Sequence, residues 1–407
     1  MQALANLHIF LIVNLKNRTK VDIKRNSILI IISFIIITLA AFSLGCKDPN
    51  LSAQSSNEQP PNQSTVEIDD TNFTPFPDTG TLPCSNKAIF CVGLVVDSTG
   101  INDNAFNQSA WTAVERAKND LNAKISYKES QNSGEFGKNI KSFAEQGYDV
   151  VVTVSSSMRD STLLVADKYP ETHFIGVDQH QFSEVSNVSG LIFSERKAGF
   201  LAGVLAGIIT ETEVVGIISG PENIHENRSY KEGFEYGLRS VRPDTVIYSE
   251  FFNSQSSNSS SDLSWGATTA KDMSAKGADI IFVSGSTEGS NALLAISETK
   301  NTFCIGANAD QWLYIPEARD CIVSSAVKDI ETGVFELIAW VALGKAKQGN
   351  YLGNVNLAPF HDYEKSLTAE IRIFMKEVNH KIESGEISIF AADQLIENVP
   401  TISLRKR

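Results

Sequence analysis

The sequence predicts an α/β protein of two lobes, each with its own doubly wound parallel sheet. From residue 88 onward, short β-rich runs alternate with helical segments, which is the pattern of βαβ units. Several runs, such as DVVVTV, DIIFVS and VVGIIS, are apolar throughout, as expected of strands buried on both faces. The chain contains too many such runs for one sheet of ordinary size, so two lobes are the simplest arrangement.

The β-rich runs give the expected order of elements. Helical patterns such as WTAVERAKNDL and RKAGFLAGVLAGII lie between them, and the polar segment 249–264 is expected to be a loop. The strands are expected at 89–96, 149–154, 173–177, 214–219, 246–251, 279–283, 302–307 and 321–326.

The first 86 residues are expected to lie outside the lobes. Two basic residues precede a long apolar run, as in an export signal, and the run ends in small residues before Cys46, which resembles a bacterial lipobox. We therefore expect residues 1–45 to be a signal peptide and Cys46 to be lipidated; the alternative is a membrane-spanning anchor formed by the same run. Residues 46–86, rich in Ser, Asn, Gln and Pro, predict a disordered tether.

Charge and cysteine content narrow the class of protein. The formal net charge of −13 argues against a general nucleic-acid-binding surface. Four cysteines follow Cys46, and outside the cytoplasm an even number favours disulfides. Three pairings of Cys84, Cys91, Cys304 and Cys321 are possible; sequence neighbours are the simplest pairing, and four buried thiols are the alternative.

Polar and aromatic residues follow one predicted strand after another. In open parallel sheets, ligands bind beyond the carboxyl ends of the strands, so these residues predict a ligand site. The Gly- and Ser-rich loop that begins at Gly285 could offer backbone N–H groups to a ligand. The other strand-end residues are Asp97, Asp178, Phe282, Asn308 and Lys328.

The motifs of catalysis are absent from the sequence. There is no GxxxxGK[ST] or GxGxxG segment for nucleotide hydrolysis or dinucleotide chemistry, and no GxSxG or HExxH. The histidines show no metal-ligand spacing. We therefore expect a protein that is not an enzyme and has no cofactor or metal.

Several segments, taken in order, resemble one family: the basic membrane protein (BMP) family of ABC-transporter substrate-binding lipoproteins, which includes purine-nucleoside receptors. The resemblance covers roughly residues 88–346. The segments are VGLVVDSTGINDNAFNQSAW, NVSGLIFSERKAGFLAGVLAG, VVGIISG, KEGFEYGLRSVRPDTVI, IGANADQ and SSAVKD.

The resemblance implies a type I periplasmic-binding fold with a hinge and an interlobe cleft. We expect an N-terminal lobe of residues 87–191 plus about 320–350. The C-terminal lobe is expected to contain residues 192–319 plus about 351–407.

The resemblance also implies a purine held between two Phe rings, here Phe106 and Phe282. Phe106 considered alone is more typical of the first core residue of a helix. Asp178 matches the acid that reads the base, and Lys328 matches the lysine that bonds the ribose hydroxyls. Asn308 stands where the family has a ribose-binding Asp, and the loop after Gly285 carries Glu288 in place of a Gly. Asp97 and Asn107 are expected to line the N-terminal lobe's side of the site.

The function expected from this resemblance is that of a lipid-anchored, extracytoplasmic solute-binding protein. It would be a monomer that delivers a nucleoside-like, purine ligand to an ABC permease. The alternatives are a ligand sensor on the same fold, or a binder of a different small polar ligand. A nucleoside hydrolase is disfavoured because no catalytic motif is present.

Overall fold

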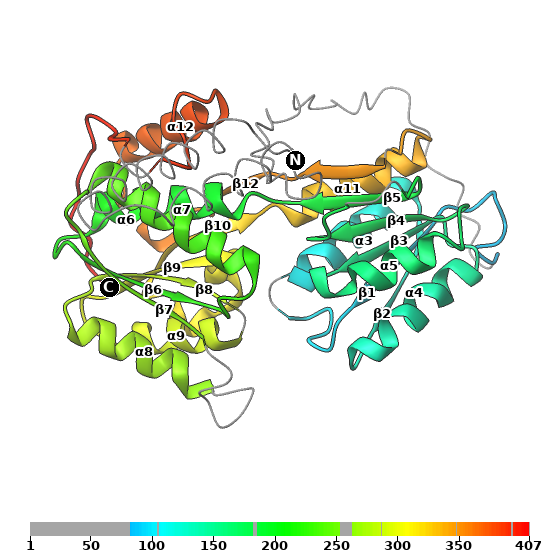
Figure 1. Ribbon diagram of the computed structural model, residues 1–407, viewed down its shortest axis with the longest axis horizontal. Coiled ribbons are helices and arrows are strands. Elements are labelled where there is room, and N and C mark those ends of the chain that lie inside the picture. The colour runs from blue at the N-terminus through cyan, green and yellow to red at the C-terminus, as the bar shows by residue number, and fades with distance from the viewer. Residues whose placement is uncertain are drawn as a thin grey trace, which may run out of the picture. The chain divides into compact units, whose positions relative to one another are not determined.

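The computed structural model forms two six-stranded sheets with helices on both faces (Figure 1). The predicted signal peptide, Cys46 and the tether up to residue 81 lie outside the described residues. The structure describes residues 82–103, 106–181, 185–252, 263–285, 287–346, 348–391 and 394–406.

The N-terminal lobe contains a wholly parallel sheet with the strand order β11-β5-β4-β3-β1-β2. Its helices are α3 (Phe106–Leu121), α4 (Phe136–Glu145), α5 (Arg159–Ala166) and α11 (Ile330–Ala342). Its strands are β1 (Cys91–Val96), β2 (Lys124–Glu129), β3 (Val150–Val154), β4 (His173–Val177), β5 (Val188–Ile192) and β11 (Gly349–Leu352).

The C-terminal lobe contains a sheet with the order β12-β10-β9-β8-β6-β7, in which only β12 runs antiparallel to its neighbour. Its helices are α6 (Glu195–Ile209), α7 (His225–Val241), α8 (Leu263–Ala275), α9 (Thr287–Ser297), the short α10 (Gln311–Tyr314) and α12 (Ala369–Glu383). Its strands are β6 (Val214–Ser219), β7 (Val246–Phe251), β8 (Ile280–Ser284), β9 (Phe303–Asn308), β10 (Ile322–Lys328) and β12 (Val355–Leu357).

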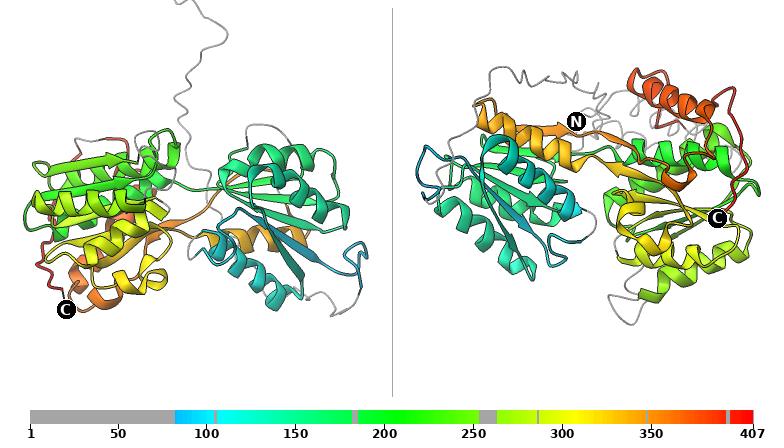
Figure 2. Two further views of the ribbon diagram at one scale, coloured as in Figure 1. Left: turned by 90° about the horizontal axis from the view of Figure 1, so that it is seen from below. Right: turned by 180° about the vertical axis from the view of Figure 1, so that it is seen from behind.

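The chain passes between the two sheets three times: from β5 to α6, from β10 to α11 and from β11 to β12 (Figure 2). The prediction that residues from about 320 return to the N-terminal lobe was wrong for 322–328, because β10 pairs in parallel with β9. The chain returns to the N-terminal lobe at Asp329. The N–H of Asp329 donates to Asn354 O at 2.9 Å, and Asn354 lies on the crossing from β11 to β12.

All eight predicted strands are present in the structure. β4, β6 and β7 have the predicted bounds, and the other five predicted strands are displaced by one or two residues at their ends. Four strands were not predicted. β2 (KISYKE) is a polar edge strand with partly exposed residues, β5 contains Ser and Gly, and β11 and β12 have four and three residues.

Both disulfides join sequence neighbours. Cys84 bonds Cys91 at the start of β1, and Cys304 of β9 bonds Cys321 just before β10. The simplest of the three pairings is therefore the one observed.

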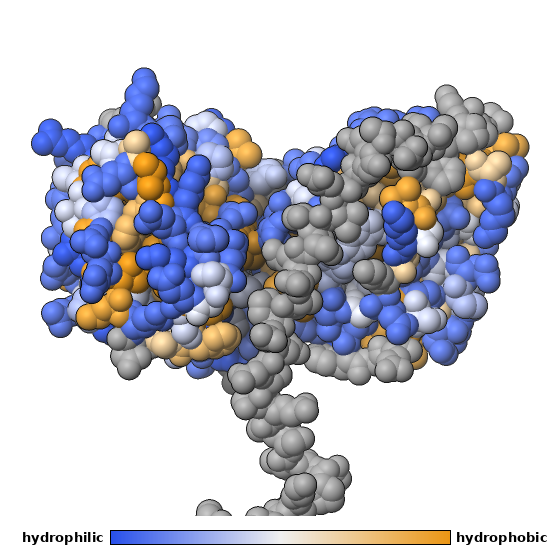
Figure 3. Space-filling model, turned by 90° about the horizontal axis from the view of Figure 1, so that it is seen from above, coloured by the Kyte–Doolittle hydropathy of each residue, from blue (hydrophilic) through white to orange (hydrophobic). Residues whose placement is uncertain are grey.

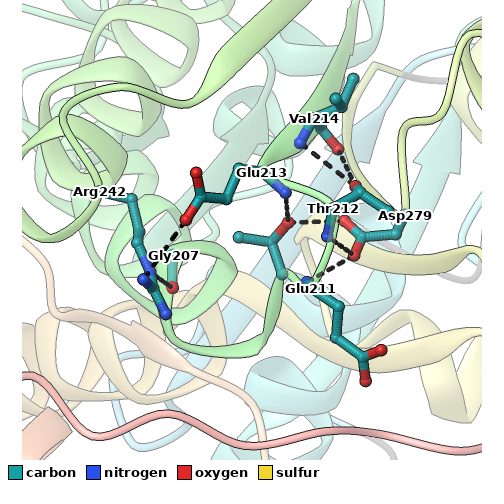
Figure 4. Close-up of polar contacts among 8 residues, drawn as sticks. Gly207, Glu211, Thr212, Glu213, Val214, Arg242 and Asp279 are labelled. Carbon is teal, nitrogen blue, oxygen red and sulfur yellow. Dashed lines mark hydrogen bonds and ion pairs between the residues drawn. The ribbon is translucent and has the colours of Figure 1, made fainter.

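A buried carboxylate stabilises the C-terminal lobe at the amino ends of its strands (Figure 4). Asp279 accepts from Thr210 Oγ1 at 2.7 Å and from the backbone N–H groups of Glu211 and Thr212 at 2.6 and 2.9 Å. These bonds tie the loop between α6 and β6 to the start of β8. Because these contacts are all within the C-terminal lobe, Asp279 has a structural role.

Helices α6 and α7 lie in backbone contact. A Cβ on Gly237 would come within 2.0 Å of Phe200 O, and one on Gly203 within 2.1 Å of Phe234 O. Only glycine permits this approach. The crossing fixes Tyr230, near the start of α7, relative to Glu195 at the start of α6.

Gly237→Ala should destabilise the protein, because the added methyl must push the two helices apart. We expect a loss of about 1–3 kcal/mol in the free energy of unfolding, as for other overpacked sites. The matched control is Gly137→Ala on α4, where a Cβ meets nothing within 4 Å and helix propensity should add roughly 0.5–1 kcal/mol. Thermal unfolding of both variants checks this; a Gly237→Ala protein as stable as wild type would contradict the packing argument.

The surface is mainly hydrophilic in the view of Figure 3, with hydrophobic residues in small groups. Among the described residues, the most exposed large apolar side chains are Leu164 in the N-terminal lobe and Ile373, Phe390 and Leu395 near the end of the chain. Within the described ranges, no helix has the length and apolar character needed to cross a membrane.

Candidate ligand-binding site

The carboxyl edges of the two sheets meet at a buried ion cluster. Lys328, the last residue of β10, places its Nζ 2.8 Å from Asp178 Oδ2 and 2.6 Å from Glu195 Oε1. The side chains of the three residues are 2 %, 12 % and 10 % exposed. Asp178 directly follows β4 of the N-terminal lobe, whereas Glu195 begins α6 of the C-terminal lobe. We call Asp178, Glu195 and Lys328 the Lys328 cluster.

The Lys328 cluster has two carboxylates for one ammonium. Burial alone would lower the pKa of Lys328, but Asp178 and Glu195 together raise it above its usual value, so the ammonium stays charged. Burial raises the pKa of Asp178 to about 6; Glu195 pushes it in the same direction and Lys328 opposes both. The cluster therefore has an excess of negative charge at neutral pH and gains a proton near pH 6.

Aromatic rings from three elements surround the Lys328 ammonium. Its Nζ lies 5.1 Å from the ring centroid of Phe106, 5.6 Å from that of Phe193 and 5.9 Å from that of Tyr230, within the range of cation–π attraction. Phe106 is partly exposed at the start of α3, while Phe193 and Tyr230 are buried. Phe106 is thus not a core residue and has ring surface available to a ligand.

The Tyr230 hydroxyl is a buried polar group that lacks a normal hydrogen bond within the described chain. The backbone of Asn308 lies near enough to lower the pKa of the phenol slightly, but no bond of normal geometry joins them. Burial nevertheless raises the pKa of Tyr230 overall, so the hydroxyl keeps its proton. A buried hydroxyl without a partner is rare in proteins and is a natural contact for a polar ligand.

Phe282 lies in the core of the C-terminal lobe. Its side chain is fully buried and stacks on Phe234 of α7, with ring centroids 4.8 Å apart and an interplanar angle of 8°. This placement argues against the predicted clamp of Phe106 and Phe282, because the ring faces α7 and leaves no surface for a ligand. The aromatic residue that approaches the Lys328 cluster from this side is Tyr230, one helical turn before Phe234.

Asn107 and Asp97 hold the loop that precedes Phe106. The Asn107 amide donates to Asp97 Oδ1 at 3.0 Å, to Thr99 Oγ1 at 2.9 Å and to Gly100 O at 3.0 Å, and the residue is 2 % exposed. Asp103 accepts from the N–H of Asn107 at 2.9 Å, at the start of α3. Asn107 therefore ties the start of α3 to residues 97–100 after β1.

The predicted residues Asn308 and Gly285 end neighbouring strands in left-handed backbone conformations. Asn308, the last residue of β9, has φ +70°. Gly285, directly after β8, has φ +155°, and Asp178, directly after β4, has φ +57°. Such conformations in residues other than Gly cluster at functional sites. The Asn308 backbone lowers the pKa of Tyr230 against the larger effect of burial, and a Cβ on Gly285 would lie 3.2 Å from Gly220 N.

The structure thus brings Phe106, Asp178 and Lys328 together and adds three residues that the search of strand ends missed: Glu195, Phe193 and Tyr230. Phe193 directly follows β5, a strand that was not predicted, whereas Glu195 and Tyr230 lie in helices and follow no strand directly. The aromatic pair at positions i and i+4 of α7 was the one available signal for Tyr230. In the described part of the chain, no group of His, Cys, Asp and Glu side chains could hold a metal ion.

The fold corresponds to that of solute-binding proteins. Two solved ABC-transporter solute-binding proteins share the fold. That of Aeropyrum pernix has a TM-score of 0.63 at 21% identity, covering 74% of this chain and 92% of that one; that of Conexibacter woesei has a TM-score of 0.61 at 21% identity, covering 74% and 98%.

Residues 90–354 match the Bmp family model, described as ABC transporter substrate-binding protein PnrA-like, so the chain belongs to this family. The relatives include "ABC transporter nucleoside-binding protein BmpA" of Lactococcus lactis, 26% identical over 73% of this chain and 88% of its own length. "Basic membrane protein A" of Borreliella afzelii is 24% identical over 73% and 94%. The family consists of solute-binding proteins of ABC transporters, which are not enzymes, as predicted.

Proposed function

We propose that this protein is the lipid-anchored, extracytoplasmic binding component of an ABC importer, and that its ligand is a purine nucleoside or a close analogue. Family membership supports a small solute as the ligand. The name of the Lactococcus relative supports a nucleoside. The lipobox-like residues before Cys46 support the anchor and an extracytoplasmic location.

The observation that carries the ligand class is the position of a partly exposed aromatic residue, Phe106, beside a buried ion cluster. Phe106 offers ring surface 5.1 Å from the Lys328 ammonium, and Asp178 lies 2.8 Å from that ammonium. A flat base stacked on Phe106 would gain about 1–3 kcal/mol. Asp178 would accept from ring N–H groups, and Lys328 would donate to sugar hydroxyls.

The charge of the Lys328 cluster adds a limit on the ligand. Two buried carboxylates face one ammonium, so a phosphate would meet excess negative charge. A nucleoside is uncharged at neutral pH. The site should therefore accept nucleosides and reject nucleotides. Asn308 contributes an amide where other members of the family have a carboxylate.

Isothermal titration calorimetry at pH 7.5 tests this proposal. The panel contains adenosine, guanosine, inosine, their free bases, ribose and the corresponding monophosphates. We expect saturable binding of at least one purine nucleoside, with at least tenfold weaker binding of its free base and its monophosphate. Absence of heat with every nucleoside, or stronger binding of ribose than of any nucleoside, would refute the assignment.

A further inference from the structure

Glu195 is the member of the Lys328 cluster that makes none of the proposed ligand contacts. It begins α6, where Ser194 accepts from Lys197 N–H at 3.3 Å and so caps the helix. A carboxylate in this first turn is favoured by the helix dipole. The residue is 8 % exposed and its Oε1 lies 2.6 Å from Lys328 Nζ, the shorter of the two ion pairs.

The two acids of the cluster reach Lys328 from different lobes. Lys328 and Glu195 both belong to the C-terminal lobe, so their ion pair lies within one lobe. Asp178 belongs to the N-terminal lobe and ends β4. A ligand that bonds both Asp178 and Lys328 must compete with the ion pair between them. After that pair is broken, Glu195 is the carboxylate that still balances the buried ammonium.

We propose that Glu195 is a positioning residue for ligand binding: it holds the Lys328 ammonium in place from within the C-terminal lobe, and thereby frees Asp178 to exchange Lys328 for the ligand. This inference rests on the proposed function for its ligand. The arrangement itself can also be tested on the ligand-free protein.

Glu195 also acts on Asp178 through its charge. The groups that face Asp178 are Lys328 on β10, Glu195 on α6, and Glu226 and Tyr230 on α7. Of these, Glu195 and Glu226 favour the protonated acid, and Glu195 has the larger influence. Removal of the Glu195 carboxylate should therefore lower the pKa of Asp178.

The sign of the resulting pH dependence follows from proton linkage. The pKa of Asp178 is about 6 in the folded protein and near 3.8 in the unfolded chain, so between these values the folded state holds the extra proton. This residue therefore makes the protein less stable as pH rises from about 4 to 6. Protonation of Asp178 should also weaken ligand binding below about pH 6, because a protonated carboxyl group accepts hydrogen bonds less well than a carboxylate.

The decisive variant is Glu195→Gln, which keeps the shape of the side chain and removes its charge. The control is Glu383→Gln. Glu383 of α12 forms an ion pair with Lys197, which lies on α6 like Glu195, and the Glu383 side chain is 50 % exposed. Melting temperatures of the ligand-free proteins are measured from pH 4.5 to 7.5. Dissociation constants for the tightest nucleoside of the panel are measured over pH 5 to 8.

We expect Glu195→Gln to weaken nucleoside binding about tenfold at pH 7.5, and to move the acid limb of the binding profile to lower pH. The difference in melting temperature between Glu195→Gln and wild type should change across pH 4.5 to 6.5, whereas Glu383→Gln should show no such change over that interval. Unchanged affinity together with an unchanged pH profile would overturn the proposal. If wild type binds no nucleoside, the proposed function fails, and the melting profile alone then decides whether Glu195 controls the cluster.

Discussion

Lys328→Met is expected to destabilise the protein by about 3–5 kcal/mol at pH 7.5 and to reduce nucleoside binding by one to two orders of magnitude. The variant leaves the carboxylates of Asp178 and Glu195 buried without their cation, and removal of one partner of a buried ion pair costs about this much. The loss of binding follows from hydrogen bonds between a charged donor and the ligand, worth about 1.5–3 kcal/mol. Chemical unfolding and calorimetry measure the two effects separately.

The stability deficit of Lys328→Met should shrink as pH falls toward 5, because Asp178, whose pKa is already raised to about 6 by burial, then takes up a proton. A triple variant, Lys328→Met with Asp178→Asn and Glu195→Gln, removes all three charges. It should recover most of the lost stability without recovering the ligand. If Lys328→Met is as stable as wild type at pH 7.5, the cluster is not the buried ion pair described above.

Phe106→Ala is expected to weaken purine nucleoside binding about 10- to 100-fold with little change in stability. Phe106 is partly exposed and begins its helix, so its removal leaves no buried cavity in the core. The expected loss corresponds to one base stacked on an aromatic face, about 1–3 kcal/mol. Titration of wild type and variant with the same nucleoside measures it.

Two variants control this result. Phe106→Tyr keeps the ring and should retain binding within a few fold. Phe390→Ala removes a 71 % exposed ring elsewhere on the surface and should leave the affinity unchanged. Equal affinities for Phe106→Ala and wild type would show that the base does not stack on Phe106.

The sequence was sufficient to predict the fold class and the edge of the sheets where the polar residues gather. Buried parallel strands such as VVGIIS are apolar throughout, so composition alone predicted them. The edge strand β2 and the short strands β11 and β12 were not predicted, because their neighbours in the sheet stabilise them and their local composition does not indicate a strand.

The candidate site was predictable only where its residues follow strands. Asp178 and Lys328 met that condition, and Glu195 and Tyr230 did not. Phe282 lies inside β8, two residues before its end. Residues of a strand alternate between the two faces of the sheet, and the Phe282 ring faces α7 and packs on Phe234. The direction of a side chain depends on the helix that covers the strand, and strand position alone does not give it.

A crystal structure of the protein with the tightest nucleoside of the calorimetric panel tests the central claim most directly. The account predicts the base stacked on the Phe106 ring, its ring N–H groups bonded to Asp178, and Lys328 Nζ bonded to the sugar while still paired with Glu195. A ligand bound away from Phe106, or one that leaves the 2.8 Å ion pair of Asp178 and Lys328 intact with no contact to either, would contradict it.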